Sequence, residues 1–175
     1  MATTVFILIA YLIGSLSFAV IVSCAFGLPD PHSYGSGNPG ATNVLRTGRK
    51  SAALLTLLGD GAKGWVAVYF ARQLASQYGV DETGIAGVAL AVFIGHLFPV
   101  FFGFRGGKGV ATCAGFLLVL YPWFVLALGI VFAAIARFGR KASIGSLSLW
   151  SSPGPSVARN PSGRAGSPLL RVMVR

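Results

Sequence analysis

The sequence predicts an all-α fold, a polytopic bundle of membrane-spanning helices, and three observations lead to that prediction. Hydrophobic residues make up 54% of the 175-residue chain and charged residues only 10%, whereas a soluble domain carries about 25% charged residues. The apolar residues form runs long enough to cross a hydrocarbon core of about 30 Å. Short loops rich in glycine and basic residues lie between these runs.

Two apolar segments and a long polar loop make up the first part of the chain. Residues 5–26 carry no charge and predict one membrane-spanning helix, and a polar loop follows over residues 29–50. The second predicted span, residues 51–71, contains Asp60 and Lys63, which share a helix face because they lie three residues apart. Charges inside a span mark functional candidates, but a self-neutralising pair that packs helices, or a lysine that snorkels to the membrane surface, is an equal alternative.

An acidic connection leads into the third predicted span. Residues 73–83 hold Asp81 and Glu82, and the span follows over residues 84–104. His96 lies eight residues before the end of this span, or about 12 Å at 1.5 Å per residue. Such a histidine often hydrogen-bonds neighbouring helices, but a basic turn follows the span, so contact with a substrate is the second interpretation.

Residues 110–138 form the last long apolar segment. One helix of this length would measure about 43 Å and would need a tilt of about 45° to fit the hydrocarbon core, which exceeds the usual range. Pro122 therefore predicts a break between two shorter helices, residues 110–120 and 122–138. Residues 142–150 could begin a sixth helix.

The positive charges predict how these helices are oriented. Loops rich in Lys and Arg face the cytoplasm, and the basic residues cluster at residues 46–50, 105–108 and 137–141. All three clusters reach the same side only if the chain breaks at Pro122. We therefore expect five membrane helices up to this point, with the N-terminus and the acidic connection outside.

The end of the chain differs from the rest. Residues 151–175 are rich in Pro, Ser, Gly and Arg and contain no acidic or aromatic residue. This composition can neither bury a core nor span a membrane. The sequence therefore predicts a membrane domain over residues 1–150 and a disordered polar tail over residues 151–175.

The composition and spacing also exclude several classes of function. The net charge of +10 raises the question of nucleic acid binding, but the basic residues lie in separate short loops and not in one stripe. Positive loops beside membrane spans report topology and contact with anionic lipid. No His, Cys or carboxylate group has the spacing of metal ligands, and no Ser-His-Asp arrangement stands out. We expect no metal and no nucleic acid partner.

Two glycine-rich loops resemble nucleotide-binding motifs but do not meet their requirements. Residues 35–40 match G-x-G-x-x-G, yet a dinucleotide site needs a preceding strand, and here a membrane helix precedes the loop. Residues 105–109 read Arg-Gly-Gly-Lys-Gly, but the phosphate loop of nucleotide hydrolases also needs an earlier glycine, where Phe102 stands, and a Ser or Thr, where Gly109 stands.

The physical basis of both motifs nevertheless remains. Glycines let successive backbone N–H groups converge on an anion, and nearby Arg and Lys side chains supply full charge. Arg46 ends the first loop, the second holds Arg105 and Lys108, and both loops are expected on the cytoplasmic side. Two phosphate cradles on one membrane face indicate two phosphorylated ligands, or one ligand and a leaving phosphate. The alternative is that the glycines only bend the chain, although Asn38, Thr42 and Asn43 in the first loop add groups that could recognise a hydroxyl.

Four segments together resemble one known family over residues 14–149. They read GSGNPGATNVLR, DGAKG, GHLFPVFFGFRGGKGVAT and ARF…KASIGSL, and they resemble the bacterial acyl-phosphate:glycerol-3-phosphate acyltransferases. The resemblance implies a multi-pass enzyme of the bacterial inner membrane whose active site faces the cytoplasm. It implies transfer of a fatty acyl group from acyl phosphate to the 1-hydroxyl of sn-glycerol 3-phosphate, giving lysophosphatidic acid and phosphate in the first step of phospholipid synthesis. It implies no cofactor, no metal and no direct use of acyl-CoA or acyl carrier protein; the enzyme that forms acyl phosphate is an expected partner.

The resemblance also assigns roles to individual residues. Arg46 and the glycine backbone would bind phosphate, Ser36 and Asn38 would contact substrate, and Arg105 and Lys108 would hold phosphate charge. Because phosphate is a good leaving group, we expect direct attack by the glycerol hydroxyl, with the substrate's own phosphate or His96 as base. The expected catalytic residues are His96, Lys108 and Arg46, and the expected substrate-binding residues are Ser36, Gly37, Asn38, Gly40, Thr42, Asn43, Asp60, Lys63, Arg105, Gly106, Gly107, Gly109 and Ser143.

The last part of the chain departs from the family pattern. The resemblance implies two further helices and a third motif with His, Asn and Glu, but nothing after Trp150 matches, and a shifted reading frame near residue 150 is our hypothesis for this change. Two alternatives therefore stay open. One is a small multi-pass anion or phosphate transporter, which intramembrane charges and broken helices would suit, and the other is an inactive truncated relative.

Overall fold

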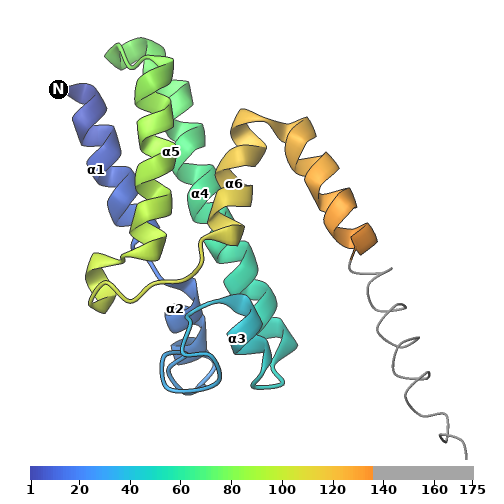
Figure 1. Ribbon diagram of the computed structural model, residues 1–175. Coiled ribbons are helices and arrows are strands. Elements are labelled where there is room, and N and C mark those ends of the chain that lie inside the picture. The colour runs from blue at the N-terminus through green and yellow to red at the C-terminus, as the bar shows by residue number, and fades with distance from the viewer. Residues whose placement is uncertain (136–175) are drawn as a thin grey trace, which may run out of the picture. The chain divides into compact units, whose positions relative to one another are not determined.

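The computed structural model describes residues 1–135, and all regular structure in that part of the chain is helical, as the sequence predicts (Figure 1). Ser143, the sixth-helix segment 142–150 and the tail 151–175 lie outside the described residues. The elements are α1 Ala2–Gly14, α2 Phe18–Ala25, α3 Ala41–Leu45, α4 Lys50–Tyr78, α5 Glu82–Leu97, a 3₁₀ turn Val100–Phe102, α6 Val110–Leu120 and a further helix Pro122–Ile135.

The first predicted span is wrong as one continuous helix. α1 and α2 are two helices bent by 41° around a short break. Two polar contacts stabilise this break: the Ser15 hydroxyl donates to the Tyr11 carbonyl at 2.9 Å, and Lys63 Nζ donates to the Leu16 carbonyl at 2.6 Å. A backbone oxygen that loses its helical partner inside a membrane protein needs another donor, and the side chain of Lys63 supplies it.

α4 is longer than the predicted second span. It continues through 29 residues to Tyr78, so most of the predicted connection from residue 73 is helical. No proline interrupts this stretch, and the helix ends only at Gly79, which adopts a left-handed φ of 63°. Asp81 then caps α5, because its carboxylate accepts a hydrogen bond from the Gly84 amide at 2.8 Å.

α5 is shorter than the predicted third span. It ends at Leu97 and not at residue 104. Pro99 disfavours helical backbone at the residue before it, and Phe98 accordingly leaves the helix with φ −128° and ψ 69°. His96 therefore lies in the last turn of α5, and the continuous helix from which its depth of about 12 Å was predicted does not extend beyond Leu97.

The break predicted at Pro122 is present. α6 ends at Leu120, and the next helix begins at Pro122 and is described as far as Ile135. Within the described residues, Glu82–Phe102 is the one continuous segment long and apolar enough to cross a membrane by itself, and the bent pair α1–α2 would make a second.

Glycines allow the helices to approach closely. α4 packs against all the other labelled helices. A Cβ atom on Gly115 of α6 would overlap the Gly61 carbonyl of α4, and one on Gly64 would overlap the Thr112 carbonyl. Small residues at helix crossings are typical of membrane proteins, where close backbone contact stabilises association. Large apolar side chains instead face outward, as lipid contact requires; examples are Leu8, Leu12, Leu54, Leu58, Phe70, Leu90 and Leu118.

Candidate functional site

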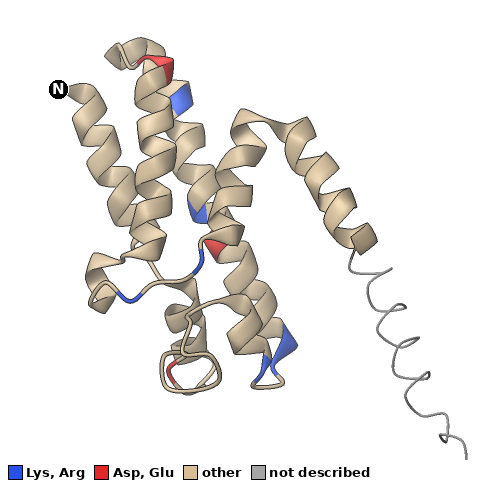
Figure 2. Ribbon diagram, in the orientation of Figure 1, with Lys and Arg blue, Asp and Glu red and all other residues tan. Residues whose placement is uncertain are grey.

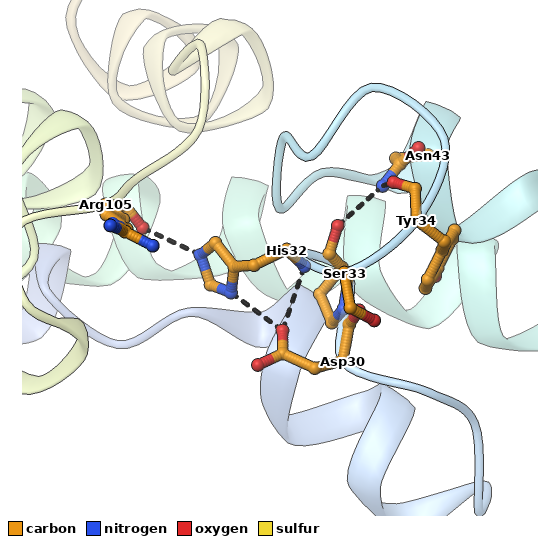
Figure 3. Close-up of polar contacts among 7 residues, drawn as sticks. Asp30, His32, Ser33, Tyr34, Asn43 and Arg105 are labelled. Atoms are coloured by element: carbon orange, nitrogen blue, oxygen red, sulfur yellow. Dashed lines mark hydrogen bonds and ion pairs between the residues drawn. The ribbon is translucent and has the colours of Figure 1, made fainter.

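The first glycine-rich loop is shaped by the buried side chain of Asn43. Its amide oxygen accepts from the Ser36 backbone N–H at 3.0 Å. Its amide nitrogen donates to the carbonyls of Pro31 and Tyr34 at 2.8 and 3.1 Å, and Figure 3 shows Asn43 beside Tyr34. Only 2% of Asn43 is exposed. The sequence predicts a substrate contact here, but the structure uses the whole amide inside the loop, so Asn43 shapes the site.

Left-handed glycines turn the chain beneath Arg46. Gly35 has a φ of 60° and Gly37 a φ of 66°, a region that side-chain-bearing residues rarely adopt. A Cβ atom on Gly35 would lie 3.1 Å from Arg46 Cδ, so the arginine side chain crosses the glycine backbone while remaining exposed. Ser36 and Thr42 are also exposed. The loop therefore presents an arginine and two hydroxyls on its outer side.

The second glycine-rich loop lies directly on His96. The Gly107 amide donates to the His96 carbonyl at 3.1 Å. A Cβ atom on Gly107 would overlap His96 Nε2 and would lie 3.0 Å from the Pro39 carbonyl oxygen. Since only glycine leaves this space free, the sequence lets the second loop contact both the histidine and the first loop. The two predicted phosphate cradles are thus neighbours.

A buried polar network lies beneath the second loop. Asp60 Oδ1 is 3.0 Å from Lys63 Nζ and 3.5 Å from His96 Nδ1, and Thr112 Oγ1 is 3.2 Å from the same histidine nitrogen. Neither contact of Asp60 Oδ1 has hydrogen-bond geometry, so its attraction is chiefly ionic. With Lys63 bound to the Leu16 carbonyl, the network connects α4, α5, α6 and the break after α1. Asp60 and Lys63 thus form a buried, self-neutralising pair between packed helices, and their role in substrate binding stays a prediction.

Sequence reasoning missed a contact between the two loops. His32 Nδ1 lies 2.7 Å from Asp30 Oδ1, and His32 Nε2 lies 3.0 Å from the Arg105 carbonyl oxygen (Figure 3). The backbone amide of His32 also donates to Asp30 at 2.9 Å, and this bond lowers the pKa of the Asp30 carboxyl. An aspartate that bonds the amide two residues on is a recognisable turn signal. It could have identified the turn, but not the distant partner.

The cations needed for phosphate binding are exposed around the two loops. Arg46, Arg105 and Lys108 all have exposed side chains. Figure 2 shows basic residues in the loop after α3 and in the loop between α5 and α6, whereas acidic residues mark the start of α5. Within residues 1–135, no group of three His, Cys, Asp or Glu side chains could hold a metal ion.

The arrangement suits a ligand with both phosphate and apolar parts. Backbone amides in glycine-rich turns and exposed cations can bind phosphate oxygens. Apolar helix faces next to the loops can contact hydrocarbon. The buried network connects the helix ends under the loops, and supporting contacts of this kind hold the groups above them in place before a ligand arrives.

Comparison with known proteins agrees with this chemistry. The family model for glycerol-3-phosphate acyltransferase matches residues 4–154. The chain is 66% identical over 138 residues to a glycerol-3-phosphate acyltransferase of Thiobacillus denitrificans. This alignment covers 79% of this chain and 69% of that protein. The chain is also 64% identical over 146 residues to a glycerol-3-phosphate acyltransferase of Ralstonia pickettii, and that alignment covers 83% of this chain and 70% of the relative.

A solved structure shares the fold. It is a crystal structure of PlsY (YgiH), an integral membrane glycerol 3-phosphate acyltransferase, in its glycerol 3-phosphate form. The match has a TM-score of 0.71 and 35% sequence identity and covers 79% of this chain and 67% of that one. The resemblance predicted from the motifs is therefore confirmed, and the chain belongs to the glycerol-3-phosphate acyltransferase family.

Proposed function

We propose that this chain transfers a fatty acyl group from acyl phosphate to the 1-hydroxyl of sn-glycerol 3-phosphate, giving lysophosphatidic acid and inorganic phosphate. The observation that carries the proposal is the contact of the two glycine-rich loops at Pro39 and Gly107. Two phosphate cradles side by side can hold two phosphorylated reactants at reacting distance, and such positioning contributes much of the rate of a two-substrate reaction.

The reaction needs no covalent enzyme intermediate. The glycerol hydroxyl oxygen forms a bond to the acyl carbonyl carbon, the bond from that carbon to the phosphate oxygen breaks, and the phosphate leaves with the electron pair. The hydroxyl proton passes to a base. Negative charge grows on the carbonyl oxygen and on the leaving phosphate, so fixed cations and backbone amides stabilise the transition state more than the ground state.

Exposed cations and the loop backbone carry the phosphate contacts in this proposal. Arg46 serves the first loop, and Arg105 and Lys108 serve the second, with Arg46 and Lys108 nearest the reacting groups. Polar contacts to the glycerol come from the exposed or half-exposed side chains of the first loop, and backbone contacts come from the glycines; these residues are Ser36, Asn38, Thr42, Gly37, Gly40, Gly106, Gly107 and Gly109.

His96 has two roles to be distinguished by experiment. If Nδ1 carries the hydrogen and donates to Thr112 Oγ1, with Asp60 Oδ1 3.5 Å away, then Nε2 keeps a lone pair directed at the second loop, which suits a general base. The side chain is only 7% exposed and Gly107 covers Nε2, which favours support of the loop. We propose that His96 supports the loop and that the substrate's own phosphate acts as the base. Near-normal turnover by the His96→Gln variant would agree with this assignment. A loss of about 10³-fold in kcat would instead identify His96 as the base.

The proposal includes a location in the membrane. We place the domain in the bacterial inner membrane, with the N-terminus outside and both loops in the cytoplasm. Its described residues 1–135 supply five membrane helices when the bent pair α1–α2 counts as one and the short α3 is left out. Basic residues outnumber Asp30 in the first loop and stand alone in the second, whereas Asp81 and Glu82 lie at the start of α5, and this distribution supports the orientation (Figure 2). A cytoplasmic site would receive acyl phosphate from the enzyme that forms it.

The test is acyl transfer by the purified chain in lipid. Labelled glycerol 3-phosphate is supplied with palmitoyl phosphate or with palmitoyl-CoA, and Lys108→Ala is compared with Arg49→Ala, which removes an exposed cation outside the assigned contacts. We expect lysophosphatidic acid from acyl phosphate only, and its loss in Lys108→Ala alone. Phosphate flux across vesicles without lysophosphatidic acid would favour the transporter alternative.

A further inference from the structure

We propose that His32 is a positioning residue for this reaction: its doubly protonated imidazole clamps the Arg105 backbone to the first loop and so holds Lys108 in place for phosphate. The inference rests on the proposed function for its catalytic consequence. The clamp itself rests on the geometry of the two loops alone.

The hydrogen-bond partners determine the protonation state of His32. Nδ1 lies 2.7 Å from a carboxylate oxygen of Asp30, and Nε2 lies 3.0 Å from the carbonyl oxygen of Arg105 (Figure 3). Both partner atoms can only accept hydrogen bonds. A neutral imidazole has one N–H and can serve one of them, whereas an imidazolium has two and serves both. Full formation of the clamp therefore requires the charged ring.

The segment that carries His32 is itself held firmly. Asn43 donates to the carbonyls of Pro31 and Tyr34, the residues that flank His32 and Ser33 in the sequence. Asn43 is buried in the first loop. The imidazole thus projects from a backbone segment that is held in place at both ends. A hydrogen bond from a fixed donor loses little conformational entropy when it forms.

The second loop depends on contacts of this kind because its residues are largely small. Residues 105–109 contain three glycines, so the segment has few side chains that can restrain it. Two described bonds tie the loop to distant parts of the chain: the Gly107 amide donates to the His96 carbonyl, and the Arg105 carbonyl accepts from His32. They lie on either side of Gly106, and Lys108 follows directly. Loss of the His32 bond would leave the Arg105 side of the loop with the local bond of its amide to the Phe102 carbonyl at 3.2 Å.

The charges around His32 favour the clamp on balance. Asp30 faces Nδ1 from the same segment, and Arg105 faces Nε2 from the other loop through its carbonyl oxygen. The Arg105 guanidinium is positive and opposes the imidazolium, but its side chain is exposed to solvent, whereas the carboxylate is in direct contact. The doubly protonated ring therefore serves both acceptors, and the carboxylate of Asp30 offsets its charge.

The experiment compares three variants in the acyl-transfer assay between pH 5.5 and 8.5. His32→Ala removes the clamp, His32→Arg keeps two donors and a charge that does not titrate, and Ser33→Ala removes only a local turn contact to the Asp30 carbonyl. We expect His32→Ala to raise KM for glycerol 3-phosphate about tenfold at low pH, with a smaller change in kcat. Ser33→Ala should behave as wild type.

The ratio of the wild-type KM to the His32→Arg KM isolates the effect of the His32 side chain on substrate binding. The substrate and all other groups of the enzyme are the same in both proteins, so their effects on KM cancel. We expect this ratio to rise with pH, because a neutral imidazole can serve only one of its two acceptors. A ratio that stays constant across the range, or a folded His32→Arg without activity, would overturn the proposal.

A second measurement does not depend on catalysis. Hydrogen–deuterium exchange of the peptide over residues 103–110 should be faster in His32→Ala than in wild type at pH 6, and close to wild type in His32→Arg. Equal exchange in all three proteins would refute the clamp. Faster exchange in His32→Ala together with no acyl transfer by wild type would refute the proposed function and retain the clamp.

Discussion

The buried pair Asp60–Lys63 should behave as a unit of stability. Its side chains are 5% and 3% exposed, and the charged atoms lie 3.0 Å apart. At an effective dielectric constant of about 20, Coulomb's law gives an attraction of about 5 kcal/mol at this distance. Asp60→Asn leaves the ammonium of Lys63 buried with only the Leu16 carbonyl as a partner, and we expect it to destabilise the fold by about 3–5 kcal/mol.

The double variant separates packing from function. Lys63→Met should also destabilise by about 3–5 kcal/mol, but Asp60→Asn/Lys63→Met contains no buried charge at this position and should recover most of the loss. Reversible unfolding in mixed detergent micelles gives the four free energies, and acyl transfer gives the activities. We expect the double variant to regain stability more than activity, because Asp60 also faces His96. Single variants that lose less than about 1 kcal/mol, or additive losses in the double, would refute a coupled pair.

Three further predictions concern packing and loop shape. Gly115→Leu should abolish folding, because the larger side chain would push α6 away from α4. Gly129→Leu should fold normally, because nothing lies within 4 Å of a Cβ atom there. The yield of monodisperse protein in detergent compares the two variants. Asn43→Ala should raise KM for glycerol 3-phosphate and cost about 1–3 kcal/mol by leaving loop backbone groups unpaired. Because a bond from the His32 amide lowers the pKa of Asp30 below 3.8, exchange protection of this turn should hold above that pH and disappear as the pH falls further.

Much of the fold could be predicted because apolar length and proline are strong local signals. The all-helical class and the break at Pro122 follow from them, and both are present. The interruption between α1 and α2 had a weaker signal, because residues 5–26 contain no charge and no proline, and only Gly14, Ser15 and Ser17 mark the break. The interruption depends on Lys63, 47 residues away from Leu16, and a contact of that range does not appear in a local pattern.

The sequence predicted which types of residue form the site but not the role of each residue. Glycine-rich basic loops are visible in the sequence, and the structure brings them into contact. Asn43 looked like a ligand contact because an amide can bind a hydroxyl, but only the three-dimensional loop shows where its hydrogen bonds go. His32 lies in no recognisable motif, and its partner Arg105 is 73 residues away.

Helix ends, more than helix interiors, build this site. α1 stops before Leu16, which exposes the carbonyl that Lys63 binds. α5 stops at Leu97, two residues before Pro99, which leaves His96 in its last turn beneath Gly107. α6 begins after Gly109, and Thr112 in its first turn contacts the same histidine. A window of about 19 residues averages hydropathy across such ends, so it finds the spans and misses the site. If α5 continued to residue 104 as hydropathy suggests, the backbone that now forms the second loop's approach to His96 would be helical. The cradle therefore depends on where each helix stops.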